Sequence, residues 1–154
     1  MHTLFKPEWQ TIWQDYTMPE SASVYTKAEV VSLILDLAGY HRGRAGLIGM
    51  RLLEPSCGDG AFLREIISRL LESARGGRRK VEWSDARWEA AVTAVDLSAR
   101  AVAESRKLIL ALLADAGCPA RRAAELAETW SFQTDFLLND WADQRFDFVI
   151  GNPP

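Results

Sequence analysis

Four short apolar runs, each followed by polar or glycine residues, most constrain what this chain can fold into. They span residues 47–53, 90–95, 130–134 and 146–150. Continuous apolar runs of this length are typical of strands buried on both faces of a parallel sheet. Helix-like segments separate the runs, and this alternation predicts an α/β fold with a partial, open, mostly parallel sheet flanked by helices. In such sheets a ligand binds beyond the carboxyl ends of the strands.

Segments with apolar residues at helical spacing lie before and between these runs. Helices are predicted over residues 3–16, 27–39, 61–73, 98–116 and 119–128. Ser98 is the expected N-cap of the fourth helix, and Gly117 its expected end. The chain is therefore expected to have a helical N-terminal segment over 1–20 and one main domain over 21–154, with an insertion loop over 75–88.

The composition of the 154 residues is that of an ordinary globular protein, with 48% hydrophobic and 25% charged residues. A net charge of −3 gives no overall positive field, so a nucleic acid must be bound locally or by other parts. Cys57 and Cys118 have neither metal-ligand nor disulfide-rich spacing. No run approaches the ~18 apolar residues of a membrane span. These features predict a cytoplasmic protein with no membrane segment and no bound metal.

A glycine-rich loop follows the first predicted strand and opens the next helix. It reads Glu54-Pro55-Ser56-Cys57-Gly58-Asp59-Gly60. Its glycines allow a tight turn and a close ligand approach, and the helix N-terminus faces that ligand. A carboxylate at Glu54 suits a cationic amino-acid group, and the third glycine of the dinucleotide pattern is absent. The loop predicts a small-molecule site, although a glycine turn without a ligand is the alternative.

Two aspartates follow the next two predicted strands. Asp96 occupies the position where a carboxylate accepts the ribose hydroxyl hydrogens of a nucleoside. Its alternative role is to cap the helix that begins at Ser98. Asp135 occupies the equivalent place after the third strand and suits the amino group of an adenine, but aspartate is also common in such loops. Asp96 follows Glu54 at more than the ~20 residues of the simplest unit, and the insertion loop accounts for the excess.

The tripeptide Asn152-Pro153-Pro154 follows the fourth apolar run. An asparagine side-chain oxygen and the carbonyl of the next proline can together accept both hydrogens of a planar amino group. This draws the nitrogen lone pair out of conjugation and toward an electrophile, and the prolines fix the backbone so that the acceptors converge. A simple turn is the alternative for the tripeptide alone.

These motifs together resemble the S-adenosylmethionine-dependent amino-methyltransferases of DNA, particularly the adenine-N6 methylases of restriction-modification and phage-defence systems. The resemblance covers nearly all of the chain after about Ser21. Tyr25-Thr26 resembles the upstream Tyr-Thr-Pro motif of the family, with Lys27 in place of the proline. The resemblance implies the cofactor residues Tyr25, Thr26, Glu54, Pro55, Ser56, Cys57, Gly58, Asp59, Gly60, Phe62, Asp96, Leu97, Asp135 and Phe136, and the catalytic residues Asn152, Pro153 and Pro154.

The resemblance also implies a Rossmann-like methyltransferase fold, S-adenosyl-L-methionine as cofactor, and direct methyl transfer to the amino group of a flipped-out adenine. The short gap from Asp135 to Asn152 implies that target recognition follows the catalytic domain. The aromatic residue that completes the Asn-Pro-Pro motif is absent. The chain is therefore expected to be an N-terminal fragment that binds cofactor and is nearly inactive on DNA by itself. A fourth strand at the sheet edge could also pair with a second copy.

Alternatives from other classes stay open. A glutamine side chain in protein or an RNA base presents the same planar amino group as adenine. A non-catalytic cofactor-binding or interaction module is a further alternative. Basic residues that could touch phosphates, or simply be solvated, are Arg75, Arg78, Arg79, Lys80, Arg121 and Arg122. The tryptophans, namely Trp9, Trp13, Trp83, Trp88, Trp130 and Trp141, are expected to pack rather than to stack on bases.

Overall fold

A computed structural model of the chain describes residues 26–76 and 81–153. Several predictions fall on other residues. Outside the described ranges lie the predicted helix 3–16 and segment 1–20, Tyr25, Pro154, the basic residues Arg78, Arg79 and Lys80, and Trp9 and Trp13.

The described chain forms a four-stranded sheet in the order β3-β2-β1-β4, with every neighbouring pair parallel. The strands are β1 (Leu52–Glu54), β2 (Val92–Asp96), β3 (Ser131–Gln133) and β4 (Phe148–Val149). Leu52 of β1 pairs with Val92 of β2 on one side and with Phe148 of β4 on the other. The predicted parallel α/β sheet is confirmed, and β4 lies at its edge.

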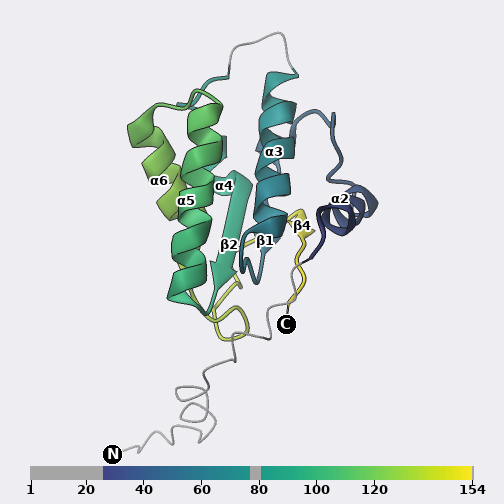
Figure 1. Cartoon of the computed structure of the whole chain (residues 1–154), viewed down its shortest axis with the longest axis vertical. Helices are drawn as coiled ribbons and strands as arrows, with labels where there is room; N and C mark the ends of the chain where they lie inside the picture. Colours follow the sequence, from purple (N-terminus) through teal and green to yellow (C-terminus); the bar gives the residue numbers. More distant parts are fainter. Residues whose placement is uncertain (1–25, 77–80, 154) are drawn as a thin grey trace, which may run out of the picture.

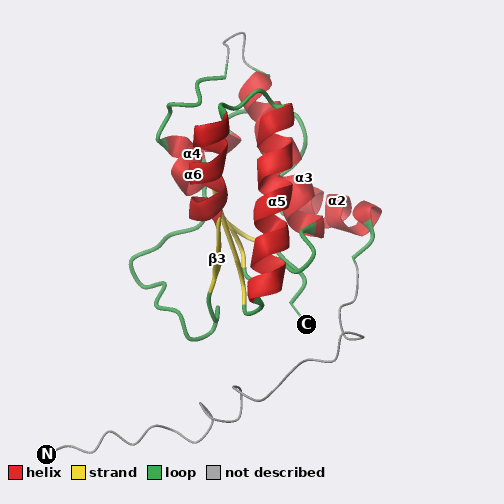
Figure 2. Cartoon of the chain, turned by 60° about the vertical axis from the view of Figure 1, so that its left-hand side comes forward, coloured by secondary structure: helices red, strands yellow, loops and turns green. Residues whose placement is uncertain are grey.

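Helices flank this sheet. They are α2 (Ala28–Leu37), α3 (Ala61–Arg75), α4 (Arg87–Ala91), α5 (Ala99–Asp115) and α6 (Ala120–Trp130). The long helices α3 and α5 run side by side along the strands (Figures 1 and 2). The Ser98 hydroxyl accepts a hydrogen bond from the Ala101 amide at 3.3 Å, and Gly117 has a φ of +81°, so both predicted ends of α5 are confirmed. No helix in the described ranges is long and apolar enough to cross a membrane.

The first predicted strand is only partly correct. Residues Leu47–Gly49 form a short 3-10 helix, and β1 begins at Leu52. Gly46, with a φ of +81°, starts this turn in a conformation that a strand does not contain. Leu47 is as buried as a strand residue, so apolar content alone could not separate the two structures.

The predicted insertion loop is shorter than expected. Helix α3 continues to Arg75 rather than ending at residue 73, and α4 begins at Arg87. Strand β2 therefore starts at Val92 instead of residue 90. Helix α4 places Trp88 in the core: its ring stacks on Trp83 at 4.9 Å between centroids, and its carbonyl accepts a bond from the Trp130 indole at 2.6 Å. The predicted packing role of these tryptophans is confirmed.

A buried arginine joins α2 to α3. The Arg69 side chain is fully buried, and its guanidinium donates to the Asp36 carboxylate at 2.6 Å and the Glu65 carboxylate at 2.8 Å. It also donates to the Tyr40 carbonyl at 2.7 Å and to the Ser32 hydroxyl at 2.8 Å. A buried charge is tolerated only when it is paired and hydrogen-bonded in this way. Arg69 thus fixes the position of α2 on the rest of the fold.

Replacing Arg69 by methionine is expected to lower the free energy of unfolding by about 3–5 kcal/mol, because its acidic and carbonyl partners lose their donor inside the protein. Urea denaturation measures this change. The matched control is Arg121→Met, which removes an arginine that is 90% exposed and paired with Glu125. The control is expected to change stability by less than about 0.5 kcal/mol. Equal losses in the two variants would contradict the anchoring role of Arg69.

Candidate functional site

The strand order reverses at β1, and this reversal locates the candidate site. The chain passes from β3 across the sheet to β4 on the far side of β1, where the Ile150 amide donates to the Leu53 carbonyl at 2.9 Å. Ligands of open α/β sheets bind at such a switch point, beyond the carboxyl ends of the strands. In Figure 1 the last described residues lie at the lower end of the sheet, toward which the β2 arrow points. The predicted site residues that the structure describes lie at this same end, whereas Tyr25 and Pro154 are outside the described ranges.

The glycine-rich loop is held by backbone hydrogen bonds to β2. The Cys57 amide donates to the Val95 carbonyl at 3.0 Å, and the Gly58 amide donates to the Asp96 carboxylate at 2.9 Å. Gly58 and Gly60 have φ values of +49° and +82°. A Cβ added at Gly60 would come within 2.7 Å of Leu108, whereas one at Gly58 would meet nothing within 4 Å. The left-handed backbone at both positions favours glycine, and Gly58 faces open space from which a ligand can approach.

Of the two roles predicted for Asp96, the structure shows the capping role, and the ribose-binding role stays a prediction. One carboxylate oxygen accepts from Gly58 and the other accepts from the Ser98 amide at 2.8 Å, at the start of α5. Its capping alternative is thus observed. Each carboxylate oxygen can accept two hydrogen bonds, so the side chain keeps acceptor capacity for hydroxyl groups. The half-buried Asp96 links the glycine loop to the end of β2.

Glu54 is the most unusual group at the site. Its side chain is 1% exposed, and its Oε2 atom has no hydrogen-bond partner among the described residues. Burial raises the pKa of this carboxyl well above its ordinary value, and the negative charges of Asp59 and Asp96 raise the pKa further. A buried acid with one oxygen unpaired among the described residues, at the end of β1, is suited to a cationic ligand group.

Asp135 and Phe136 lie in the loop after β3. The Thr134 amide donates to the Asp96 carbonyl at 3.1 Å, which places this loop beside the end of β2. The Asp135 carboxylate accepts from the Leu137 amide at 2.9 Å and so shapes its own turn. Phe136 packs against Trp141 with 5.9 Å between ring centroids. Both predicted residues therefore lie in one loop at the carboxyl end of the sheet.

Leu97 directly follows β2, in the short connection to α5. Its side chain is 65% exposed. Its carbonyl accepts a hydrogen bond from the Gln133 side chain at 2.8 Å. The sequence did not single out Gln133, because nothing local marks a glutamine that closes a loop from another strand.

The Asn152 motif lies against the first residues of the glycine loop. A Cβ added at Gly151 would come within 3.2 Å of the Pro55 side chain, so the two segments are in close contact. Asn152 and Pro153 are exposed, and the Asn152 amide nitrogen donates to the Thr26 hydroxyl at 3.2 Å. Gly151 was missed as a site residue, although a glycine directly before Asn-Pro-Pro is a signal of close approach.

Two predicted cofactor residues turn their side chains into the core. Cys57 is 2% exposed and its sulfur accepts from the Ser105 hydroxyl at 3.3 Å. Burial raises the pKa of the Cys57 thiol to about 12, which leaves it protonated and unreactive. Phe62 is 4% exposed and belongs to the main hydrophobic cluster. Packing accounts for these two side chains, and only backbone groups there are left to face a ligand.

Pro55, Ser56 and Asp59 complete the loop. Pro55 and Ser56 are half-buried, whereas Asp59 is exposed. The Asp59 carboxylate accepts from the Ala61 amide at 3.1 Å, which stabilises the first turn of α3.

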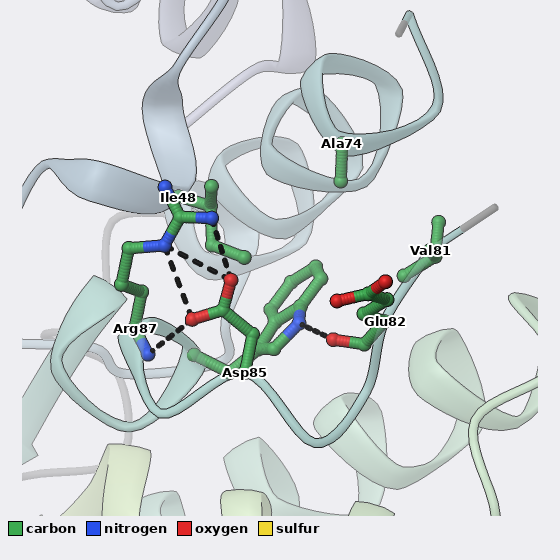
Figure 3. A pocket seen from close by; sticks show the side chains of 7 residues that line it. Ile48, Ala74, Val81, Glu82, Asp85 and Arg87 are labelled. Carbon is green, nitrogen blue, oxygen red and sulfur yellow. Dashed lines mark hydrogen bonds and ion pairs between the residues drawn. The ribbon is translucent and has the colours of Figure 1, made fainter. Parts of the chain in front are cut away.

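Two small cavities lie away from this end of the sheet. One, of about 150 Å³, is lined by Ile48, Ala74, Val81, Glu82, Asp85, Arg87 and Trp88 (Figure 3). The other, of about 220 Å³, is lined by Gly43, Ala45, Glu72, Ser73 and Gly76. Both are smaller than the ~300 Å³ at which ligand pockets begin. In the first, Asp85 is paired with Arg87, which lowers the pKa of that carboxyl to about 2.

The basic residues on α6 are engaged within the protein. Arg121 pairs with Glu125 at 2.9 Å. Arg122 pairs with Glu89 at 3.0 Å and donates to the Trp83 carbonyl at 2.9 Å. These contacts favour a structural role for the pair over phosphate binding.

Comparison with known proteins shows similarity to Type II methyltransferases. The chain is 43% identical over 132 residues to Type II methyltransferase M.PaeR7I of Pseudomonas aeruginosa, an alignment that covers 86% of this chain and 22% of that protein. It is 36% identical over 137 residues to M.XhoI of Xanthomonas vasicola, covering 88% and 24%. It is 37% identical over 138 residues to M.BstVI of Geobacillus stearothermophilus, covering 86% and 24%.

No protein-family model and no solved structure matches the chain. The chain spans about a quarter of the length of these curated relatives. Within that span, its parallel sheet flanked by helices is an α/β, Rossmann-like methyltransferase fold. The chain is thus similar, over most of its own length, to one part of the Type II methyltransferases.

Proposed function

We propose that this chain is the cofactor-binding portion of a DNA methyltransferase of a restriction-modification or phage-defence system. The proposed reaction moves a methyl group from S-adenosyl-L-methionine to the exocyclic N6 amino group of adenine. The observation that carries this proposal is the juxtaposition of Glu54, at the end of β1, with Gly151 and Asn152, which follow the adjacent strand β4. Similarity to the Type II methyltransferases supports it.

The residues at the ends of three neighbouring strands fit the chemistry of the cofactor. Glu54 offers a buried carboxyl to the ammonium group, and Asp96 offers oxygens to the ribose hydroxyls. Asp135 and Phe136 would hold the adenine through its amino group and ring. Adjacent strands are ~4.8 Å apart, so these three ends span on the order of 10 Å, as an extended nucleoside with an amino-acid arm requires. The cofactor would supply the methyl group on its sulfonium.

The residues after β4 would bind the acceptor. The Asn152 side-chain oxygen and the Pro153 carbonyl can accept the two hydrogens of an amino group, which leaves its lone pair directed at the methyl group. Both residues are exposed, as contact with a base outside the duplex requires. No ionisable side chain is needed as a nucleophile, and holding the two reactants in line supplies the rate.

Glu54 makes cofactor affinity depend on pH. Below its raised pKa the carboxyl is protonated, and a bound ammonium group favours the ionised form, so binding releases a proton. At pH values below the raised pKa of Glu54, cofactor affinity is therefore expected to rise by up to about tenfold for each unit of increasing pH. Calorimetry in buffers of different ionisation enthalpy measures the released proton. Glu54→Gln is expected to bind more weakly and without proton release, whereas the exposed-site control Glu128→Gln is expected to match the unaltered chain.

Stability without ligand has the opposite dependence on pH. Between the ordinary pKa of a glutamic acid and the raised pKa of Glu54, the folded chain holds one more proton than the unfolded chain. Its free energy of unfolding is therefore expected to fall by about 1.4 kcal/mol per pH unit as pH rises through this window, relative to Glu54→Gln. Urea denaturation across pH measures the difference. A constant difference between the two proteins would show that Glu54 titrates normally.

Methyl transfer is tested with the chain together with any further residues that its gene encodes. Labelled S-adenosylmethionine is supplied with DNA, RNA or protein, and the labelled product is identified by mass spectrometry. The expected product is N6-methyladenine in DNA. Asn152→Ala is expected to lower the rate by at least about 100-fold, as removal of a preorganised polar group does in other enzymes, and Gln144→Ala, at an exposed residue outside the site, is expected to have no effect.

Other products would correct the proposal. Label in RNA or on a protein glutamine would replace DNA as the substrate, and label on cytosine would replace adenine. Absence of cofactor binding at millimolar concentration would favour a non-catalytic module.

A further inference from the structure

A hydrogen bond joins the first described residue to the Asn152 motif. The Asn152 side-chain nitrogen donates to the Thr26 hydroxyl at 3.2 Å, across 126 residues of sequence. An asparagine amide has a donor end and an acceptor end, and a rotation of half a turn about its last bond exchanges them. Only the acceptor end can bind the hydrogen of a target amino group. The contact with Thr26 occupies the donor end.

We propose that Thr26 is a positioning residue that holds the Asn152 side-chain amide in place for the substrate; this inference rests on the proposed methyl transfer. With the amide nitrogen held by Thr26, the amide oxygen points away from Thr26 and stays open to an acceptor base. The Thr26 hydroxyl can also donate, so a reversed amide would remain bonded to it, but that amide would turn its NH₂ group toward the substrate and repel amino hydrogens. The role proposed for Thr26 is therefore to limit the motion of the Asn152 side chain, in the observed arrangement with the amide oxygen free for the substrate.

Both partners are held by the same part of the fold. Thr26 directly precedes Lys27, whose carbonyl accepts the first bonds of α2 from the Val30 and Val31 amides at 3.0 and 3.1 Å. Helix α2 is in turn fixed on α3 by Arg69. Asn152 is two residues from Ile150, which is bonded to β1. Since β1 leads into α3 through the glycine loop, connected and packed elements carry both ends of the hydrogen bond.

Threonine suits this role better than a flexible side chain. Its β-branch restricts rotation about χ1, so the oxygen is held in place once the backbone is fixed. The hydroxyl accepts from Asn152 and keeps one hydrogen to donate elsewhere. Valine has the same shape without the acceptor, and serine keeps the acceptor without the branch, so these two substitutions separate the hydrogen bond from packing.

The first measurement needs no activity. In a ¹⁵N-labelled chain, the Asn152 side-chain NH₂ signals are identified by their loss in Asn152→Asp. Thr26→Val is expected to shift these signals toward those of a free amide and to speed their hydrogen exchange, and Thr26→Ser is expected to keep them near their original positions. Thr129→Val is the matched control, because it removes an exposed hydroxyl that bonds only within α6, to Glu125.

The second measurement is single-turnover methyl transfer with the protein as its gene encodes it. Thr26→Val is expected to lower the rate at saturating cofactor about tenfold, as the loss of one hydrogen bond allows, so that any change in the cofactor Kd does not account for the loss. Thr26→Ser is expected to recover most of the rate. In an Asn152→Ala background, Thr26→Val is expected to cause no further loss, because the group it holds is already gone.

Three results would overturn the inference. The first is an unchanged Asn152 signal and rate in Thr26→Val. The second is a weaker cofactor Kd that accounts for the whole loss of rate, which would make Thr26 a cofactor residue. The third is an equal tenfold loss in the Asn152→Ala background. If the unaltered protein transfers no methyl group while the Asn152 signals still respond to Thr26→Val, the proposed function fails and the contact itself stands.

Discussion

Parallel pairing on both sides of β1 is the constraint on which the candidate site depends. Leu52 and Leu53 are paired with β2 on one side and β4 on the other, in the same direction. Because all strands run alike, every loop that follows a strand emerges at one end of the sheet. Residues far apart in sequence, such as Glu54 and Asn152, therefore become neighbours through strand order rather than through contacts of their own.

Two buried charged residues, Arg69 in the scaffold and Glu54 at the candidate site, differ in how fully their polar atoms are hydrogen-bonded. Each guanidinium nitrogen of Arg69 donates to a carboxylate, a carbonyl or a hydroxyl, and the side chain joins two helices. Glu54 is equally buried, yet one of its oxygens has no partner among the described residues and two further acids lie near it. A saturated network stabilises a structure. A buried acid with an unpaired oxygen is costly to the fold and is more typical of a functional site than of a scaffold.

The sequence predicted the ends of a helix where residues within one turn determine them. Ser98 and Gly117 delimit α5 because a cap and a left-handed residue act within one turn. The turn at Leu47 was missed because burial makes apolar turns and strands alike in sequence. The side-chain directions of Cys57 and the partners of Arg69 were beyond prediction, since they depend on packing between distant segments. The row of strand-end residues was foreseeable from parallel topology alone, while their roles in binding and catalysis stay predictions.

The sheet order also has a consequence for how the protein is made. Strand β1 leaves the ribosome before both of its neighbours, and the neighbour on one of its sides, β4, follows β2 and β3 in chain order. At ordinary rates of translation, β4 is synthesised on the order of seconds after β1, and until then one edge of β1 has no strand paired with it. During this interval its unpaired amides and carbonyls are available to the strands of other nascent chains. The brevity of β1, three residues in all, limits how well such a wrong partner can be held.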